Sequence, residues 1–156
     1  MQRIIIAAMS TERVIGRGDG MPWQVPAEYQ HFLHTVRGQT LIMGRRSWEI
    51  FGADVTSAHN VVISRSADLA GVTVVGSLEA ALAQAETYGL PAYIAGGASI
   101  YQQALAADVV DEMVLSTIHG TFTGDAYFPD FDRARWTVTA QQEFADYTVT
   151  RYQRRR

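Results

Sequence analysis

Two segments of the chain combine glycine, hydroxyl and guanidinium groups in the way that phosphate-binding sites do. In "LIMGRRSWEIFG" (41–52), an apolar stretch runs through Gly44 into a helical pattern. Its first turn would contain Arg45, Arg46 and Ser47, and helix N-terminal amides beside such side chains suit a phosphate. Surface arginines would explain this segment equally well on its own.

The second segment, "YIAGGASIYQQAL" (93–105), repeats the arrangement without arginine. Gly96 and Gly97 let the backbone approach a ligand closely just before the next helix starts. A tight turn alone would explain such a glycine pair, but two strand-to-helix phosphate candidates in one small protein favour a dinucleotide. "NVVISRS" (60–66) adds Ser64 and Arg65, which could bind an adenosine 2′-phosphate and so favour NADPH over NADH.

Glu28, in "GDGMPWQVPAEYQHF" (18–32), is the candidate acid. Pro26 suits the first position of a helix, and Glu28 would then lie in the first turn, where acids favour the positive end of the helix dipole. That explanation predicts an exposed Glu28. Val25 is a poor N-cap, however, so a function other than capping could also explain this carboxylate.

Other chemistries find little support in the sequence. His31 and His34 have a spacing that can serve a metal, but the chain has no cysteine and no acid near them except Glu28. We therefore predict surface histidines and no metal. Neither a Gly-x-Ser-x-Gly segment nor a P-loop is present, so hydrolase and NTPase functions lack a starting residue.

The elements that must position these residues alternate along the chain. Six apolar, β-branched runs predict strands buried on both faces of a mostly parallel sheet: 3–9, 40–44, 60–64, 72–76, 92–97 and 112–118. Helical patterns begin at Pro26 and Ala98, and a third has Ser77 as N-cap and Gly89 as stop. The end of the chain, 135–144 and 147–153, alternates apolar and polar residues and predicts an antiparallel hairpin on the sheet edge.

This order predicts a single α/β domain spanning 1–156, with helices around a central sheet. In open sheets of this kind, ligands bind beyond the carboxyl ends of the strands, which places function in the loops after them.

The composition agrees with a single folded domain, since 47% hydrophobic and 19% charged residues are typical of a globular protein. A net charge of -3 argues against nucleic acid, and "RRR" (154–156) is best explained as a solvated tail. No apolar run is long enough to span a membrane and no secretory signal is present, so we expect a cytoplasmic protein.

Taken together, these segments resemble the dihydrofolate reductase family. "IIIAAMSTERVIGRGDGMPWQVPAE", "LIMGRRSWEIFG", "NVVISRS", "IAGGASIYQQAL" and "TGDAYFPD" look like the motifs of that family in the family's order, over nearly the whole chain. The resemblance implies NADPH-dependent reduction of a dihydropterin ring, in tetrahydrofolate biosynthesis and one-carbon metabolism. It also implies the family's three-layer fold, with an eight-stranded, mostly parallel central sheet and helices on both faces. A monomer that is a target of antifolates is the family's usual form.

The resemblance assigns a role to each candidate. Glu28 is the buried acid that binds the pterin and keeps a proton near N5, Ser116 hydrogen-bonds it, and Trp23 holds a water beside it. The pterin and its substituent are expected to contact Ile6, Ala8, Glu28, Tyr29, Phe32, Phe51, Val55, Ala95 and Ser116. Met21 and the loop 15–23 resemble a mobile lid over the nicotinamide, with Asp125 as its backbone-bonding partner.

For NADPH, the resemblance implies Ala8, Ile15, Gly44, Arg45, Arg46, Ser47, Ser64, Arg65, Gly96, Gly97, Ser99, Ile100 and Tyr101, the last also near the reacting rings. The peptide between Gly96 and Gly97 is expected to be cis.

One position departs from the family. Where an arginine usually anchors the glutamate tail of folate, this chain has Ala58, and the neighbouring supports are Ala53 and Leu33. His59 or Arg37 could replace the arginine in an ordinary dihydrofolate reductase. Alternatively, the substrate could be a dihydropteridine without a glutamate tail, with Tyr29, Phe51 and Val55 as an apolar rim. A third alternative is a pterin- or NADPH-binding protein without turnover, or an enzyme insensitive to antifolates.

Overall fold

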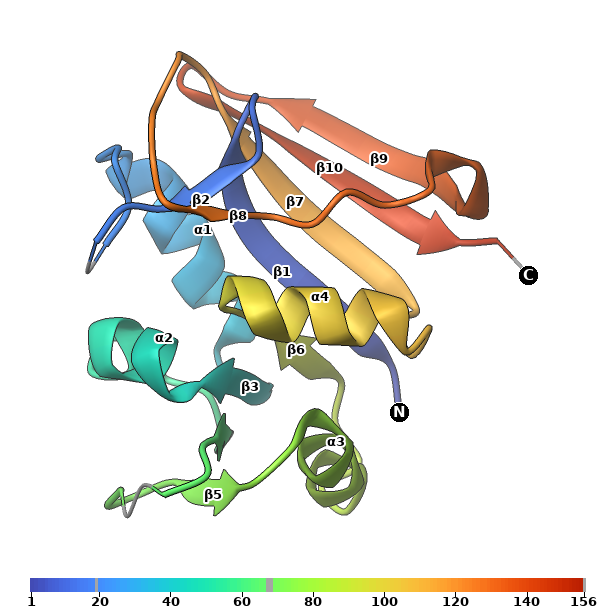
Figure 1. The fold of residues 1–156 in the computed structure, drawn as a ribbon. Helices are drawn as coiled ribbons and strands as arrows, with labels where there is room; N and C mark the ends of the chain where they lie inside the picture. The colour runs from blue at the N-terminus through green and yellow to red at the C-terminus, as the bar shows by residue number, and fades with distance from the viewer. Residues whose placement is uncertain (19, 67–68, 156) are drawn as a thin grey trace.

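A computed structural model describes residues 1–18, 20–66 and 69–155, and shows a sheet with helices on both faces (Figure 1). Two residues of predicted segments lie outside these ranges: Arg156 of the solvated C-terminal segment and Asp19 of the loop 15–23. Eight strands form the main sheet in the order β5-β4-β3-β6-β1-β7-β10-β9. They span β1 Arg3–Ser10, β3 Thr40–Gly44, β4 His59–Ile63, β5 Thr73–Val75, β6 Ala92–Ile94, β7 Glu112–Ile118, β9 Trp136–Glu143 and β10 Tyr147–Arg154.

The pairing of the strands confirms the prediction of a mostly parallel sheet with an antiparallel end. β1 pairs in parallel with β6 and β7, and β3 with β4 and β6. β10 runs antiparallel between β7 and β9, so the last strand lies inside the sheet and β9 forms its edge. The carboxyl ends of β1, β3 and β6 therefore meet at one side, where a ligand is expected.

Four α-helices divide into two layers: α1 Pro26–Val36, α2 Arg45–Phe51, α3 Leu78–Glu86 and α4 Ala98–Ala106. One apolar core joins α3 and α4 to alternate side chains of the strands, such as Ile5, Ile42 and Met113. A second core joins α1 and α2 to the side chains that point the other way, such as Ile4 and Leu41. Because both faces are covered there, the parallel strands are apolar almost throughout, as the sequence predicts, whereas β9 and β10 alternate apolar and polar residues in part.

The structure also contains elements without a sequence prediction. β2 Val14–Gly16 and β8 Ala126–Tyr127 pair antiparallel as a separate two-stranded sheet, and a 3-10 turn covers Arg133–Arg135. The small sheet fixes the start of the loop 15–23 against the segment that contains Asp125, whose N–H donates to the Gly16 carbonyl at 3.0 Å. Among the described residues, no helix is both long and apolar enough to cross a membrane.

Candidate active site

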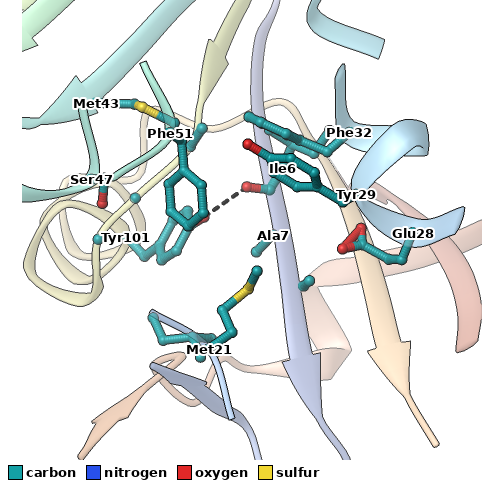
Figure 2. Close-up of a pocket in the computed structure, with 15 residues that line it drawn as sticks. Ile6, Ala7, Met21, Glu28, Tyr29, Phe32, Met43, Ser47, Phe51 and Tyr101 are labelled. Atoms are coloured by element: carbon teal, nitrogen blue, oxygen red, sulfur yellow. Dashed lines mark hydrogen bonds between the residues drawn. The ribbon is translucent and has the colours of Figure 1, made fainter. Parts of the chain in front are cut away.

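A cleft opens between α1 and α2, above the carboxyl ends of β1 and β6 (Figure 2). Its empty space is about 590 Å³, part of which is open to solvent. Most of its walls are apolar, and Glu28 is the one charged side chain in the described lining. The lining comprises Ile6, Ala7, Ala8, Ile15, Met21, Glu28, Tyr29, Phe32, Met43, Ser47, Phe51, Ala95, Gly96, Gly97 and Tyr101.

Glu28 reaches this cleft because of how α1 begins. Pro26 occupies the first turn, and Val25 provides no side-chain cap, so capping does not explain the acid. Glu28 is only 5% exposed, which excludes the alternative of an exposed, dipole-stabilising carboxylate and agrees with the buried acid that the resemblance implies. Burial raises the pKa of Glu28 to about 7, while a hydrogen bond from the Ser116 hydroxyl lowers it in part. At neutral pH the site therefore holds a carboxyl group with an exchangeable proton.

This raised pKa makes the free energy of unfolding depend on pH. Glu28 titrates near 4.5 in the unfolded chain and near 7 in the folded one, so the folded state binds the proton more tightly in that interval. Its contribution to stability is complete below pH 4.5, falls as pH rises to 7 and then stays about 3 kcal/mol lower. Glu28→Gln removes this titration. We therefore expect the change in the free energy of unfolding that Glu28→Gln causes to be more stabilising at pH 8 than at pH 4.5, by about 1 to 3 kcal/mol.

Urea unfolding of the native protein and Glu28→Gln at the two pH values measures this difference. Glu12→Gln is a matched control, because Glu12 is exposed in the turn after β1. An effect of Glu28→Gln that is equal at pH 4.5 and pH 8 would contradict the assignment of a proton-binding, buried Glu28.

The floor of the cleft is fixed by contacts between α4 and β1. The Tyr101 hydroxyl donates to the Ile6 carbonyl at 2.7 Å (dashed line in Figure 2). Gly96 has φ of 110°, and a Cβ there would lie 3.3 Å from both the Ser47 and the Tyr101 hydroxyl oxygens. Only glycine fits this backbone comfortably. The Gly96-Gly97 peptide is cis, as predicted.

A second groove continues from the cleft, and the two share Ile15, Met21, Ser47, Phe51 and Gly97. Its remaining described lining consists of Gly16, Gly18, Gly20, Gly44, Arg45, Arg46, Ile50, Ala98, Ser99, Ile100, Asp125 and Ala126. The N-cap of α4, Gly97, has no side-chain cap, so the first amides of this nine-residue helix are available to a ligand. Two arginines, a serine hydroxyl and these amides are a donor set that fits a dinucleotide phosphate.

The loop 15–23 lies against this groove through contacts at Gly18. The Gly18 N–H donates to Asp125 Oδ2 at 3.0 Å, so Asp125 bonds the loop backbone as predicted. From the other side, the Arg46 guanidinium donates to the Gly18 carbonyl at 2.9 Å. The same arginine that faces the groove therefore also contacts the loop that borders it.

Most of the predicted site residues come together in the cleft and the groove. Five predicted positions do not line either space in the described structure: Val55, Ser116, Trp23, Ser64 and Arg65. Ser116 still acts on the cleft through Glu28. Trp23 is buried and its ring lies edge-on to Phe122 at 5.5 Å.

The remaining three lie further out. Ser64 and Arg65 follow β4, where the Ser64 N–H bonds the Val75 carbonyl at 2.8 Å. Val55 packs with the core around α1 and α2.

Sequence reasoning missed several lining residues. Ala7 and Met43 belong to the cleft, and Ile50, Ala98 and Ala126 to the groove. Met43 could have been found, because it is the last apolar residue of its strand at the carboxyl edge of the sheet. Ala126 could not, because nothing in the sequence indicates that β8 pairs with β2.

The two histidines of α1 have different surroundings. His31 is partly buried, and its pKa is lowered by burial and by the Arg151 charge, whereas His34 is exposed. The expectation that both are surface histidines was therefore wrong for His31. The part of the chain that the structure describes contains no group of three or more His, Cys, Asp or Glu residues that could bind a metal ion.

The predicted replacements for a tail-binding arginine lie apart from the cleft. His59 stacks on Tyr88, with ring centroids 3.8 Å apart and an interplanar angle of 2°. Arg37 is exposed after the end of α1, and Ala58 is exposed just before β4. Neither His59 nor Arg37 lines the cleft in the described structure.

Comparisons with known proteins agree on one family. The family model "Dihydrofolate reductase" matches residues 3–155. The chain is 35% identical over 156 residues to dihydrofolate reductase type A13 of Escherichia coli, covering 97% of this chain and 93% of that protein. It is 37% identical over 142 residues to a dihydrofolate reductase of Neisseria gonorrhoeae, covering 89% of this chain and 86% of that protein. A solved structure of Enterococcus faecalis dihydrofolate reductase, complexed with NADP(H) and RAB-propyl, superposes with a TM-score of 0.87 at 27% identity, covering 99% of this chain and 97% of that one.

Proposed function

The chain belongs to the dihydrofolate reductase family, and on this premise we propose that it reduces 7,8-dihydrofolate to tetrahydrofolate with NADPH, as a single domain. The observation that carries the proposal is Glu28, a buried carboxyl group with a pKa of about 7 beside an apolar cleft that fits a flat ring. This reaction belongs to tetrahydrofolate biosynthesis in one-carbon metabolism. The alternatives without a glutamate tail or without turnover are not favoured, because the relatives that match nearly the full chain are named dihydrofolate reductases.

Glu28 performs two tasks in the proposed reaction. As a carboxylate it accepts hydrogen bonds from the 2-amino group and the adjacent ring nitrogen of the pterin, which orients the ring in the cleft. As a carboxylic acid it keeps a proton in the site at neutral pH, and reduction of the N5–C6 bond requires a proton at N5. Ser116 holds the carboxyl group in place, and the side chains of Phe32 and Met21 exclude water around it.

The groove beside the cleft is the proposed cofactor site. When bound, NADPH supplies the hydride that reaches C6 of the pterin. Arg45, Arg46 and Ser47, with the first amides of α4, would hold its phosphates. Because Gly96 and Gly97 have no side chains, their backbone lies close to the Ser47 hydroxyl group, and at Gly96 also to the Tyr101 hydroxyl group, at the border of cleft and groove. Ser64 and Arg65 remain candidates for the outer end of the cofactor.

The test of this function is the oxidation of NADPH, followed by absorbance, with dihydrofolate and with a dihydropterin that lacks the p-aminobenzoylglutamate tail. We expect turnover of dihydrofolate with formation of tetrahydrofolate. Binding of NADPH without oxidation in the presence of either substrate would reject the proposal in favour of a binding protein.

Arg46→Ala is expected to raise the Kd for NADPH by about tenfold and the Kd for NADH by less. A charged hydrogen bond to phosphate contributes about 1.5 to 3 kcal/mol, and we assign Arg46, together with Ser64 and Arg65, to the 2′-phosphate, which NADH lacks. Fluorescence titration with both dinucleotides measures the two values. Arg45→Ala is the companion variant, because Arg45 lies beside Arg46 but pairs with Glu49 at 2.8 Å. Equal losses for NADPH and NADH would show that Arg46 acts on the pyrophosphate or on the loop at Gly18 instead.

The oligomeric state and the cellular location of the protein are part of this proposal and are those usual for the family. We expect a monomer with a small-molecule substrate, in the cytoplasm. Size-exclusion chromatography with light scattering tests the first expectation, and fractionation of cells that express the chain tests the second.

A further inference from the structure

Tyr29 connects the two walls of the cleft at its open side. It follows Glu28 on α1, and its ring centroid lies 6.1 Å from that of Phe32 and 6.0 Å from that of Phe51 on α2. Figure 2 shows the rings of Tyr29 and Phe32 beside each other and the ring of Phe51 across from them. The Tyr29 hydroxyl donates to Asp54 Oδ2 at 2.6 Å, and Asp54 lies in the turn after α2. One hydrogen bond therefore joins α1 to the segment that follows α2.

Asp54 adds an uncompensated negative charge at this mouth. It is exposed, and among the described residues no cation lies within ion-pair distance of its carboxylate. The segment between α2 and β4, residues 52–58, contains no other charged residue. The described lining of the cleft contains no cation either, and its one charged side chain is Glu28.

The hydrogen bond from Tyr29 limits where this charge can move. A phenol that donates to a carboxylate at 2.6 Å holds it in one direction, whereas an exposed aspartate would otherwise sample several rotamers. Burial, and then the neighbouring Asp54, raise the pKa of Tyr29, so its hydroxyl stays a donor throughout the physiological range. The carboxylate is thus kept beside the aromatic rings at the mouth.

This inference rests on the proposed function and refines its substrate class. Glu28, which binds the pterin in the proposed function, is 5% exposed, whereas the hydrogen bond between Tyr29 and Asp54 is exposed, so we expect a substituent on the pterin to leave the cleft past Tyr29. We propose that Asp54, held at the mouth by Tyr29, is a specificity-determining residue that disfavours substrates whose tail is negatively charged. The glutamate of dihydrofolate carries two carboxylates, and each further glutamate would add one more.

Asp54→Asn tests the charge with little change in shape, because the amide oxygen can still accept from Tyr29. The quantity to measure is kcat/KM for dihydrofolate divided by kcat/KM for a dihydropterin without the tail. We expect this ratio to rise about 3- to 10-fold at low ionic strength, through KM and not kcat. At 1 M salt, where the screening length falls to about 3 Å, the rise should largely disappear. Glu79→Gln, which removes the same charge from α3, is the control and should leave the ratio unchanged.

Tyr29→Phe tests whether the hydrogen bond positions the charge. It keeps the ring and the charge but removes the donor, so the ratio should rise by less than with Asp54→Asn. In the double variant, the effect should equal that of Asp54→Asn alone, because the hydroxyl acts through the carboxylate. A ratio that Asp54→Asn leaves unchanged, or changes equally at low and high salt, would overturn the inference while leaving the proposed function intact. Failure of the native protein to turn over either substrate would instead reject the proposed function.

Discussion

Glu28→Gln is expected to reduce the rate of hydride transfer at pH 7 by about 10²- to 10⁴-fold. Glutamine can fill the space and still accept one hydrogen bond, but it cannot keep an exchangeable proton near N5 of the pterin. For the native protein, the rate should be constant below the Glu28 pKa of about 7 and fall about tenfold per pH unit above it. For the variant, the rate should keep rising as pH falls, since the proton must then come from solvent. Single-turnover kinetics with NADPH and its 4-deuterated form isolate this step.

Two controls separate chemistry from binding. The Kd for NADPH should be nearly unchanged in Glu28→Gln, because the proposed phosphate-binding residues lie in the neighbouring groove. Ser116→Ala should move the midpoint of the pH profile upward, because the Ser116 hydroxyl stabilises the charged form of Glu28. Unchanged turnover in Glu28→Gln would remove Glu28 from the mechanism.

The secondary structure could be predicted where the sequence carries a long local signal. The strands 40–44 and 112–118 have the predicted bounds, and Ser77 caps α3 through a hydrogen bond to the Ala80 N–H at 3.0 Å. The pairing of β2 with β8 could not be predicted, because strands of three and two residues are too short to show a period. The two strands also lie more than 100 residues apart in the chain, and only the fold brings them together.

The candidate site shows the same division between local and tertiary information. Gly44 and Arg46 could be placed at the groove, because the strand 40–44 ends at the carboxyl edge of the sheet with Gly44 and Arg46 follows it. The burial of Glu28 could not be derived from helix signals, since a first-turn acid looks the same whether it faces solvent or a cleft. Only the packing of α1 against β1 and α2 distinguishes the two cases. The Tyr29 to Asp54 hydrogen bond likewise joins residues 25 positions apart that no local pattern relates.

In the described structure no cation lines the cleft, and this has a direct consequence for the KM for dihydrofolate. The resemblance implies an arginine at the position of Ala58, and neither suggested replacement lines the cleft, because His59 stacks on Tyr88 and Arg37 is exposed at the end of α1. A charged hydrogen bond to a carboxylate contributes about 1.5 to 3 kcal/mol, which corresponds to about 10- to 100-fold in affinity. The native enzyme should therefore bind the pterin well and the glutamate tail weakly.

Ala58→Arg is accordingly expected to lower the KM for dihydrofolate by about 10- to 100-fold. Ala58 is exposed just before β4, so a long side chain there displaces no core residue, and the resemblance implies the tail-binding arginine at this position. The KM for a dihydropterin without the tail should not change, because it has no carboxylate to bind, and steady-state kinetics with both substrates measure the difference. Ala58→Gln is the matched control, since it adds length without charge.

If dihydrofolate turnover in the native protein is efficient and Ala58→Arg barely improves it, another residue must already bind the tail. If the improvement is restricted to dihydrofolate and weakens at high salt, charge at the mouth sets the preference for the substrate tail, and Asp54 and position 58 act on it in opposite directions.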